Sequence, residues 1–576
     1  MTIFLGIIDL NDFDINHDKK SILKHTLESD IKDKCSFELF DRSFYCLSYD
    51  NGAYKETGVF RDKESFTLTV GDPIISNAKK RSRQHDVLIL HDEFKNKSIA
   101  SLSEARGVFS GIHFNCVDQQ CYIFTDKLGI RPVYFYVKSG LLVFSSILKY
   151  FDNFLFLDLK EDTNGLYETV AFKFPLANRT PYKYIKLLKN SEILSVKQNK
   201  LTSRTYWDWG KAESSVKTRK SDDLSELAFN VFDDAVRLRI GDEKNSIAFL
   251  SGGLDSRCVT AAVKKYVDNL YTFNFATEKS QDGEFANEYS KNLGSKHYEI
   301  KMEKLEFPNW SQLIADAWVN DTHLSDAKSP IYPQKIWSGD GGSVGIGFVY
   351  LDELMIKILA DNTACKAVDR FIKINKIGLP LRFMSRQDGD LLIYNAILDE
   401  IKNMDTISNS RRLYMFLMLN DQRRHLHTHF ETIGSHKIEL MLPFFDSDFL
   451  SVILSVPIEQ CLNHRFYMEW FDKYPRFVGI SPWQTYPGHK KCPLETPLNL
   501  SYQWEKSKPK SNKDLLEMKH NANKTIQKII KKPALKKHLN RPYVFFAMLL
   551  HKYNIRDYSY VVELVNTLDQ YILSDR

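Results

Sequence analysis

The sequence predicts two kinds of architecture in one chain. Residues 1–206 should form an α+β sandwich of antiparallel sheets, and residues 215–576 an α/β region with a parallel sheet and extra helices. Before residue 206, short β-branched or aromatic segments recur between Gly, Pro, Asn and Asp. After residue 221, apolar strands alternate with amphipathic helices. The turn at residues 251–256 is rich in glycine and joins an apolar strand to a helix.

The first segment, residues 3–8, should be a strand, because Asp9 follows it directly and no basic flank marks a signal peptide. Two helices are expected in this half, at residues 21–27 and 163–171. The further strands expected are 43–49, 66–70, 86–90, 108–115, 120–125, 133–137 and 141–145.

The second half should begin with a helix over residues 224–236, where apolar residues recur at helical spacing. A strand at 271–275, a helix at 284–293 that Gly294 ends, and a strand at 297–300 should follow the glycine-rich turn. This alternation favours a parallel sheet with right-handed crossovers. Ligands of such sheets bind at the carboxyl ends of the strands, where the turn lies.

Composition excludes several classes of function. The 576 residues are 43% hydrophobic and 26% charged, and 79 basic against 73 acidic residues give a net charge of only +6, so no nucleic-acid partner is expected. No apolar run approaches the ~20 residues of a transmembrane helix, and we expect a cytoplasmic protein. Eight scattered cysteines suggest free thiols: Cys35, Cys46, Cys116, Cys121, Cys258, Cys365, Cys461 and Cys492.

The turn itself, Ser251-Gly252-Gly253-Leu254-Asp255-Ser256, has the chemistry of a polyphosphate site. Glycines allow close approach of the backbone, the following helix N-terminus attracts anions, and Asp255 could hold Mg²⁺. The turn resembles the SGGxDS loop of the PP-loop ATP pyrophosphatases. This resemblance implies that ATP is cleaved between its α- and β-phosphates, giving AMP and pyrophosphate.

Residues 125–135, with the sequence TDKLGIRPVYF, resemble the RDxLGxRPLY element of the glutaminase domain of asparagine synthetases, which has the N-terminal nucleophile fold. Residues 145–149 resemble that family's ASExK segment. The family's nucleophile is a cysteine exposed by removal of Met1, but this chain has Thr2 followed by Ile3. Residues 70–72 stand where the family has a glutamine-binding Asn-Gly-Glu turn. We therefore expect a scaffold without glutamine hydrolysis, with Thr2 activity as the other interpretation.

A second glycine-rich loop, residues 337–345, resembles the family's LSGDGGDE loop, which implies a role for Asp340 in adenylation. Ser343-Val344 replaces the family's Asp-Glu pair, so the carboxylate expected to share Mg²⁺ with Asp255 is missing. Either Asp255 holds the metal with phosphates and water, or another carboxylate such as Asp352 or Glu353 substitutes, or the site is compromised. Residues 437–446 resemble the LEVRxPFLD segment, with Glu439 matching its glutamate. Arg465 stands where a lysine of the family contacts phosphate.

The resemblance predicts an ATP-dependent, amide-forming ligase that passes an acyl-adenylate to ammonia, another amine or an intramolecular nucleophile, as in β-lactam synthetases and lasso-peptide cyclases. The carboxylate substrate could be a small molecule, a peptide or a saccharide, and a homodimer is possible. The predicted catalytic residues are Asp340, Arg465 and Glu439, and Asp255 is the predicted metal ligand. The predicted nucleotide-binding residues are Leu250, Ser251, Gly252, Gly253, Asp255, Ser256, Phe275, Ser338 and Gly339.

Three other functions remain open at this point: a non-catalytic binding or scaffold protein, a glutamine-dependent asparagine synthetase, and a PP-loop enzyme that modifies nucleic acid. The lysine-rich tail at residues 506–537 should be a solvated helix face, or else a strip that binds an acidic peptide, a saccharide carrier or a membrane surface.

Overall fold

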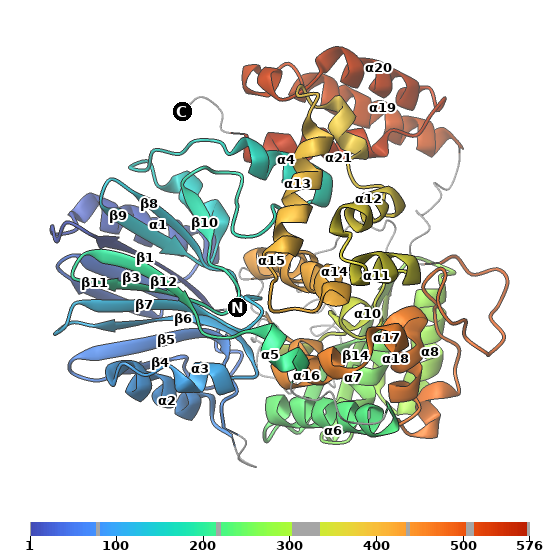
Figure 1. Ribbon diagram of the computed structural model, residues 1–576, viewed down its shortest axis with the longest axis horizontal. Coiled ribbons are helices and arrows are strands. Elements are labelled where there is room, and N and C mark those ends of the chain that lie inside the picture. The colour runs from blue at the N-terminus through green and yellow to red at the C-terminus, as the bar shows by residue number, and fades with distance from the viewer. Residues whose placement is uncertain are drawn as a thin grey trace.

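A computed structural model describes residues 2–76, 81–214, 221–301, 334–433, 438–502 and 512–572. Two antiparallel sheets face each other on one side of the molecule, and a parallel sheet surrounded by helices forms the other side (Figure 1). The residue before β1 lies at the junction between these two halves (Figure 1). The predicted fold class is therefore confirmed, whereas the division into two domains stays a prediction.

The two antiparallel sheets each contain six strands, and aromatic and aliphatic side chains such as Phe44, Phe66 and Phe114 fill the space between them. The first sheet runs in the order β10 (Ile185–Leu187), β8 (Tyr134–Lys138), β9 (Leu141–Ser145), β1 (Ile3–Asp9), β3 (Phe44–Tyr49) and β2 (Phe37–Asp41). The second runs in the order β12 (Lys200–Thr205), β11 (Glu192–Lys197), β7 (Gln120–Thr125), β6 (Val108–Asn115), β5 (Ser65–Asp72) and β4 (Val59–Arg61).

Helices cover the outer faces of this sandwich. Helix α1 (His17–Ile31) packs Leu23 and Leu27 against the first sheet, and α2 (Arg83–Lys95) with α3 (Ala100–Glu104) covers the second. Helix α4 (Thr163–Phe172) contacts helices of the other half.

The predicted strand at residues 86–90 is wrong, because this segment lies within α2. Ser82 caps the helix by accepting a hydrogen bond from the His85 N–H (3.2 Å). Val87, Leu90 and Phe94 then follow at helical spacing and are buried. A short apolar run does not distinguish strand from helix by itself, and here the cap and the positions beyond the run decide.

The parallel sheet has five strands, and its order places β13 at the centre. The order is β15 (Lys296–Lys301), β14 (Asn269–Ala276), β13 (Asn245–Phe249), β16 (Gln334–Trp337) and β17 (Ile438–Met441). Asn245–Phe249 pairs with β14 in parallel register, and Ile247 and Ala248 pair with β16, also in parallel. The carboxyl ends of β13 and β16 are thus adjacent at one edge of the sheet.

Helices pack around this sheet and extend to the carboxyl end of the chain. No helix in the described part of the chain combines the length and apolar character that a membrane crossing requires. The helices are α5 (Trp209–Ser214), α6 (Ser221–Ile240), α7 (Leu254–Lys264), α8 (Gln281–Leu293), α10 (Gly342–Gly345), α11 (Glu353–Ala360), α12 (Ala364–Ile374), α13 (Gly389–Lys402), α14 (Arg412–Phe416), α15 (Arg423–Ile433), α16 (Ser447–Ser455), α17 (Ile458–Cys461), α18 (Arg465–Phe471), α19 (Asn512–Ile529), α20 (Arg541–Lys552) and α21 (Ser559–Tyr571).

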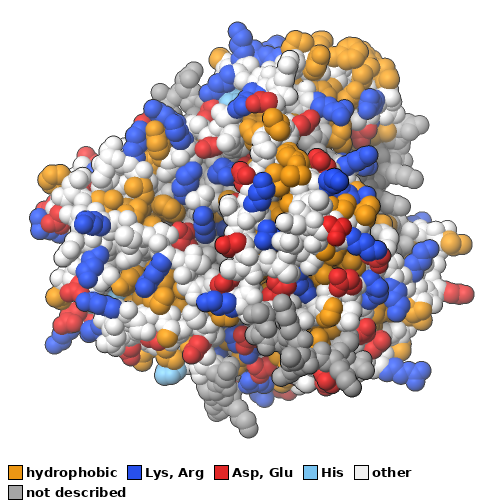
Figure 2. Space-filling model, viewed as in Figure 1, with side chains coloured by type: hydrophobic (Ala, Val, Ile, Leu, Met, Phe, Trp, Pro, Cys, Tyr) orange, Lys and Arg blue, Asp and Glu red, His pale blue; other side chains and the backbone are white. Residues whose placement is uncertain are grey.

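The last three helices form one group at the top of Figure 1, and Figure 2 shows hydrophobic side chains gathered on the surface there. Tyr543, Phe545 and Phe546 of α20 are more than half exposed. In the lysine-rich tail, Lys528 and Lys531 are exposed to solvent, whereas Lys519 is buried and donates to the Asn554 side chain (2.8 Å). Residues 506–511 of the tail lie outside the described residues.

Buried charges join the two halves. Glu439 of β17 is fully buried and pairs with Arg131, which follows β7 in the sandwich. Asp446, also fully buried, accepts hydrogen bonds from Arg106 (3.1 Å) and from Arg239 of α6 (2.9 Å). Because a buried carboxylate needs a compensating charge, these pairs constrain how the sandwich meets the parallel sheet.

Removing one partner of the Arg131–Glu439 pair should be costly. We expect Arg131→Met and Glu439→Gln each to lower the free energy of unfolding by about 3–5 kcal/mol, since each leaves the partner without its charge compensation. Urea denaturation measures this loss, and the double variant should regain part of it. Asp388→Asn, which breaks the exposed pair with Arg386, serves as the control with a much smaller loss. If the buried-pair and exposed-pair variants lost equal free energy of unfolding, the buried pairs would not constrain how the two halves meet.

The buried ammonium of Lys127, at the same junction, should make the folding stability depend on pH. Burial lowers the pKa of its ammonium to about 8, although Asp448 and Asp446 oppose the shift. The folded state therefore releases this proton at a lower pH than the unfolded state, so stability should rise between pH 8 and 10. Relative to Lys127→Met, we expect the wild type to gain up to about 3 kcal/mol over this range in chemical denaturation. A pH-independent difference between the two proteins would refute the shift.

Candidate functional site

Two glycine-rich loops meet at the carboxyl edge of the parallel sheet. Residues 251–256 follow β13 and enter α7, while residues 338–343 follow β16 and enter α10. The second loop is set by the neighbouring strand, because the Ser338 N–H donates to the Met441 carbonyl (3.1 Å). The structure thus brings together the two loops that the sequence singled out.

The first loop is held by its own serines. The Ser256 hydroxyl accepts a hydrogen bond from the Ser251 N–H (2.9 Å), and the two hydroxyls lie 2.9 Å apart. The Gly252 N–H donates to the Asp282 carboxylate of α8 (2.9 Å), so this amide is already occupied. Helix α7 begins after Gly253 without a side-chain cap, which leaves its N-terminal dipole directed at the loop.

The second loop approaches so closely that only glycine fits at two positions. A Cβ atom at Gly342 would lie 2.4 Å from the Asp255 Cγ, and one at Gly339 would lie 2.7 Å from the Ser256 nitrogen. Gly341 has φ +93°, a conformation that side chains rarely adopt. Close contact with the first loop therefore requires glycine at residues 339 and 342.

Asp255 lies between the loops. Its carboxylate accepts hydrogen bonds from the Ser343 hydroxyl (2.6 Å) and from the Tyr467 hydroxyl (2.7 Å). Burial raises the pKa of Asp255 to about 6, although these two hydrogen bonds oppose the shift, and the charge of nearby Asp340 adds to it. Ser343 therefore occupies the position facing Asp255 at which the sequence comparison expected a second carboxylate.

A cavity of about 420 Å³ opens beside the two loops. Carboxylates from Asp255, Asp340 and Asp421 line it, together with the imidazoles of His425 and His464. No lysine or arginine is among the described residues that line it. Of the predicted nucleotide-binding set, the lining includes Ser251, Gly253, Asp255, Ser256, Ser338 and Gly339.

Other predicted residues lie outside this cavity. Leu250 is buried directly after β13, the Gly252 N–H faces Asp282, and Phe275 packs against Phe249 with ring centroids 6.0 Å apart. Arg465 is half exposed and pairs with Glu353 (3.1 Å), so the structure does not bring it to the loops. Glu439 also lies outside the cavity: its carboxylate pairs with Arg131 and accepts a hydrogen bond from the Thr2 N–H (2.9 Å).

Several residues that contact the loops or line the cavity were not predicted. Tyr467 lies two residues after Arg465, which the sequence had suggested as a phosphate ligand. The side chain of Tyr467, and not that of Arg465, points to the first loop. Gln484 is brought to the cavity because its N–H donates to the Gly252 carbonyl (2.9 Å). His425 could have been found, since His425 and His429 are spaced four residues apart, which places them on one helix face.

Thr2 lies at the junction of the halves, far along the chain from these loops. Its residue is 4% exposed, and its hydroxyl donates to the Asp50 carboxylate (3.2 Å). Asp50 also lies 3.6 Å from Arg83, whose guanidinium donates to the Gly71 carbonyl (2.9 Å). The hydroxyl of Thr2 is therefore engaged and shielded.

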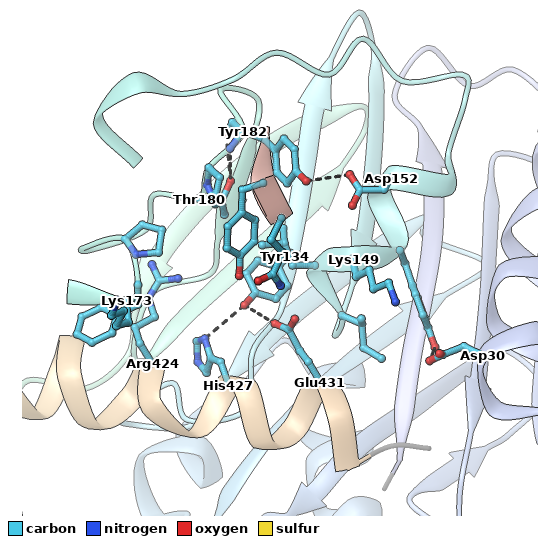
Figure 3. Close-up of a pocket in the computed structure, with 18 residues that line it drawn as sticks. Asp30, Tyr134, Lys149, Asp152, Lys173, Thr180, Tyr182, Arg424, His427 and Glu431 are labelled. Carbon is cyan, nitrogen blue, oxygen red and sulfur yellow. Dashed lines mark hydrogen bonds between the residues drawn. The ribbon is translucent and has the colours of Figure 1, made fainter. Parts of the chain in front are cut away.

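A second cavity of about 570 Å³ lies between the sandwich, α15 and α21 (Figure 3). Figure 3 shows Arg424, His427 and Glu431 projecting from α15 toward Tyr134, whose hydroxyl donates to Glu431 (2.7 Å). Burial raises the pKa of Glu431 to about 7, although the Tyr134 hydrogen bond and the charge of Arg424 oppose the shift. Helix α15 thus lines both cavities, one with each face.

Comparison with known proteins gives two family matches in chain order. The model described as glutamine amidotransferase domain matches residues 75–207, and the model described as asparagine synthase matches residues 229–332. A solved structure of glutamine phosphoribosylpyrophosphate amidotransferase from B. subtilis, complexed with ADP and GMP, covers 59% of this chain and 82% of its own. Its identity of 9% and TM-score of 0.26 are too low to establish a shared fold.

Curated relatives have one name in common. Asparagine synthetase [glutamine-hydrolyzing] 1 of Bacillus subtilis is 24% identical over 43% of this chain and 39% of its own length. Putative asparagine synthetase [glutamine-hydrolyzing] 2 of Methanocaldococcus jannaschii is 28% identical over 38% of this chain and 45% of its own. Asparagine synthetase [glutamine-hydrolyzing] of Mesocricetus auratus is 23% identical over 65% of this chain and 60% of its own length. The chain thus spans between 39% and 60% of these relatives. The two family matches and these relatives make parts of this chain similar to asparagine synthetases, with the amidotransferase match before the synthase match along the chain.

Proposed function

We propose that the protein is an ATP-dependent, amide-forming ligase. The observation that carries this proposal is the contact between the two glycine-rich loops around Asp255, beside a cavity of a size that suits a small ligand. A substrate carboxylate oxygen would attack the α-phosphorus of ATP and break its bond to the bridging oxygen, releasing pyrophosphate. An amine nitrogen would then attack the acyl carbon of the adenylate, and AMP would leave.

The chain's own groups would mainly position the substrates and stabilise charge. The N-terminus of α7 and the loop at residues 251–256 would bind the phosphates. Asp255 fits Mg²⁺, because this ion is usually held by one or two carboxylates together with substrate phosphates, and Mg²⁺ would neutralise phosphate charge there. The Ser343 hydroxyl and Tyr467 would orient the Asp255 carboxylate. Positioning and charge stabilisation are the main sources of rate in such chemistry.

The amine in this proposal does not come from glutamine. The relatives' names call those proteins glutamine-hydrolyzing, but Thr2 stands where the family has its nucleophilic cysteine. The Thr2 hydroxyl is bound to Asp50, and a hydroxyl is a far weaker nucleophile than a thiolate near neutral pH. Ammonia, another amine or an intramolecular nucleophile fits this arrangement, and the acid could be a small molecule, a peptide or a saccharide.

A non-catalytic binding protein is the second candidate. Two observations favour it: Ser343 replaces a carboxylate, and the described residues supply no lysine or arginine to the cavity. Both functions predict nucleotide binding, and only the ligase predicts turnover.

Turnover should form AMP. We expect the wild type to convert ATP to AMP and pyrophosphate when supplied with Mg²⁺, a panel of carboxylic acids and ammonia, and chromatography of the nucleotides measures the products. Asp255→Asn should lower the rate at least about 100-fold, because the charge that would hold Mg²⁺ is lost. Asp268→Asn, at an exposed carboxylate of the same half, is the matched control and should retain the rate.

An ADP product would overturn this mechanism. ATP binding without AMP formation across the whole panel would favour the binding protein. Glutamine in place of ammonia should not support amide formation, and release of glutamate that depends on Thr2 would restore the glutaminase interpretation.

The loop contact itself can be tested at two glycines of α10. Gly342→Ala places a methyl group against Asp255, so we expect a loss of about 1–3 kcal/mol in stability and weaker ATP binding by calorimetry. Gly345→Ala is the control, since its nearest neighbour would be Leu450 Cδ2 at 3.7 Å, an ordinary contact. ATP affinity that is unchanged in Gly342→Ala would place the nucleotide elsewhere.

A further inference from the structure

Three potential metal ligands converge at the edge of the loop cavity. Asp340, His425 and His429 each offer one ligand atom, and these atoms all lie within 4.8 Å of one another. The rings of His425 and His429 have centroids 5.6 Å apart. Asp340 and His425 also line the cavity, so the cluster faces the space where a ligand would bind.

The backbone brings these residues together in two ways. His425 and His429 are four residues apart on α15, so they lie on one face of the helix. A π-helical turn at Leu417–Gln422 directly precedes α15, and such turns are frequent at functional sites. Asp340 is fixed at the second loop, where the Ser338 hydroxyl donates to its carboxylate (2.6 Å).

The histidines of α15 lie on two different faces of the helix. His427 lies between His425 and His429 in sequence but points to the other cavity, where its Nδ1 lies 3.4 Å from the Tyr134 hydroxyl (Figure 3). It is therefore separated from the cluster by the helix itself. The cluster depends on helix geometry and not only on a local abundance of histidine.

We propose that Asp340, His425 and His429 bind one divalent transition-metal ion, with Zn²⁺ as the best fit. Two imidazoles and one carboxylate form a ligand set that zinc accepts with a fourth position left open. Imidazole ligands suit zinc, whereas Mg²⁺ prefers oxygen ligands. Zinc bonds of about 2.1 Å place tetrahedral ligand atoms roughly 3.4 Å apart. The three atoms therefore have to move together by up to about 1.4 Å, which side-chain rotation can supply.

The open position would face the cavity. Asp255, Asp340 and Asp421 make that cavity acidic, and none of its described lining residues is a lysine or arginine. A metal ion at the cluster would supply positive charge to an anionic ligand such as a phosphate or carboxylate. This site is distinct from Asp255, and its occupation requires no turnover of ATP.

Metal binding can be measured on the full chain without a histidine tag and without nucleotide. Equilibrium dialysis against Zn²⁺, followed by elemental analysis, should find one tightly bound ion in the wild type. His425→Gln should weaken binding at least about 100-fold, since loss of a direct ligand should cost no less than loss of a supporting contact. His425 is exposed, so this variant should fold normally.

His429→Gln and Asp340→Asn should weaken binding to a similar degree, and circular dichroism checks that they fold. His85→Asn, at an exposed histidine of α2, is the control and should bind Zn²⁺ like the wild type. As a second readout, the visible spectrum of the Co²⁺ form should change in the three ligand variants and not in the control. The site is refuted if the wild type binds no tight zinc, or if any ligand variant keeps wild-type affinity. Because ATP is absent, neither result depends on the ligase proposal.

Discussion

The burial of two carboxylates at the junction of the halves is the constraint on which the site depends. Glu439 and Asp446 have no exposed surface, and each is compensated by an arginine of the sandwich. Burying either charge without compensation would cost several kcal/mol. The segment that contains β17 and the start of α16 is therefore stable only in the position that the sandwich defines.

The position of β17 in turn sets the second glycine-rich loop. Strand β16 pairs with β17, and the Ser338 N–H donates to Met441, two residues after Glu439. The loop then passes so close to Asp255 that only glycine fits at residues 339 and 342. A carboxylate that the sequence suggested as catalytic thus supports the site through the backbone, at a distance from the cavity.

Much of this fold could be predicted, because alternation and glycine loops are local signals. The strands that were predicted in the sandwich, the strands β13 to β15 and the two loops lie where the sequence placed them, apart from the helix over residues 86–90. The strands β2, β4, β10, β11, β12, β16 and β17 were not predicted. The directions of long side chains could not be predicted in this way. Motif position suggested Arg465 as a phosphate ligand, but its guanidinium pairs with Glu353 on the surface, and Tyr467, two residues later in the same helix, reaches Asp255 instead. Such choices depend on tertiary neighbours that are distant in sequence.

The sandwich is needed for the site even if it hydrolyses no glutamine. Helix α15, which lines both cavities, begins with Arg423 and Arg424, two buried guanidinium groups. Arg423 donates to the Gly129 carbonyl (2.9 Å), and Arg424 donates to the carbonyls of Ala177 (2.7 Å) and Arg179 (2.9 Å). All three acceptors belong to the sandwich half, and buried donors of this kind need such partners. Loss of the sandwich would leave these buried donors, on the helix that carries His425 and His429, without their acceptors.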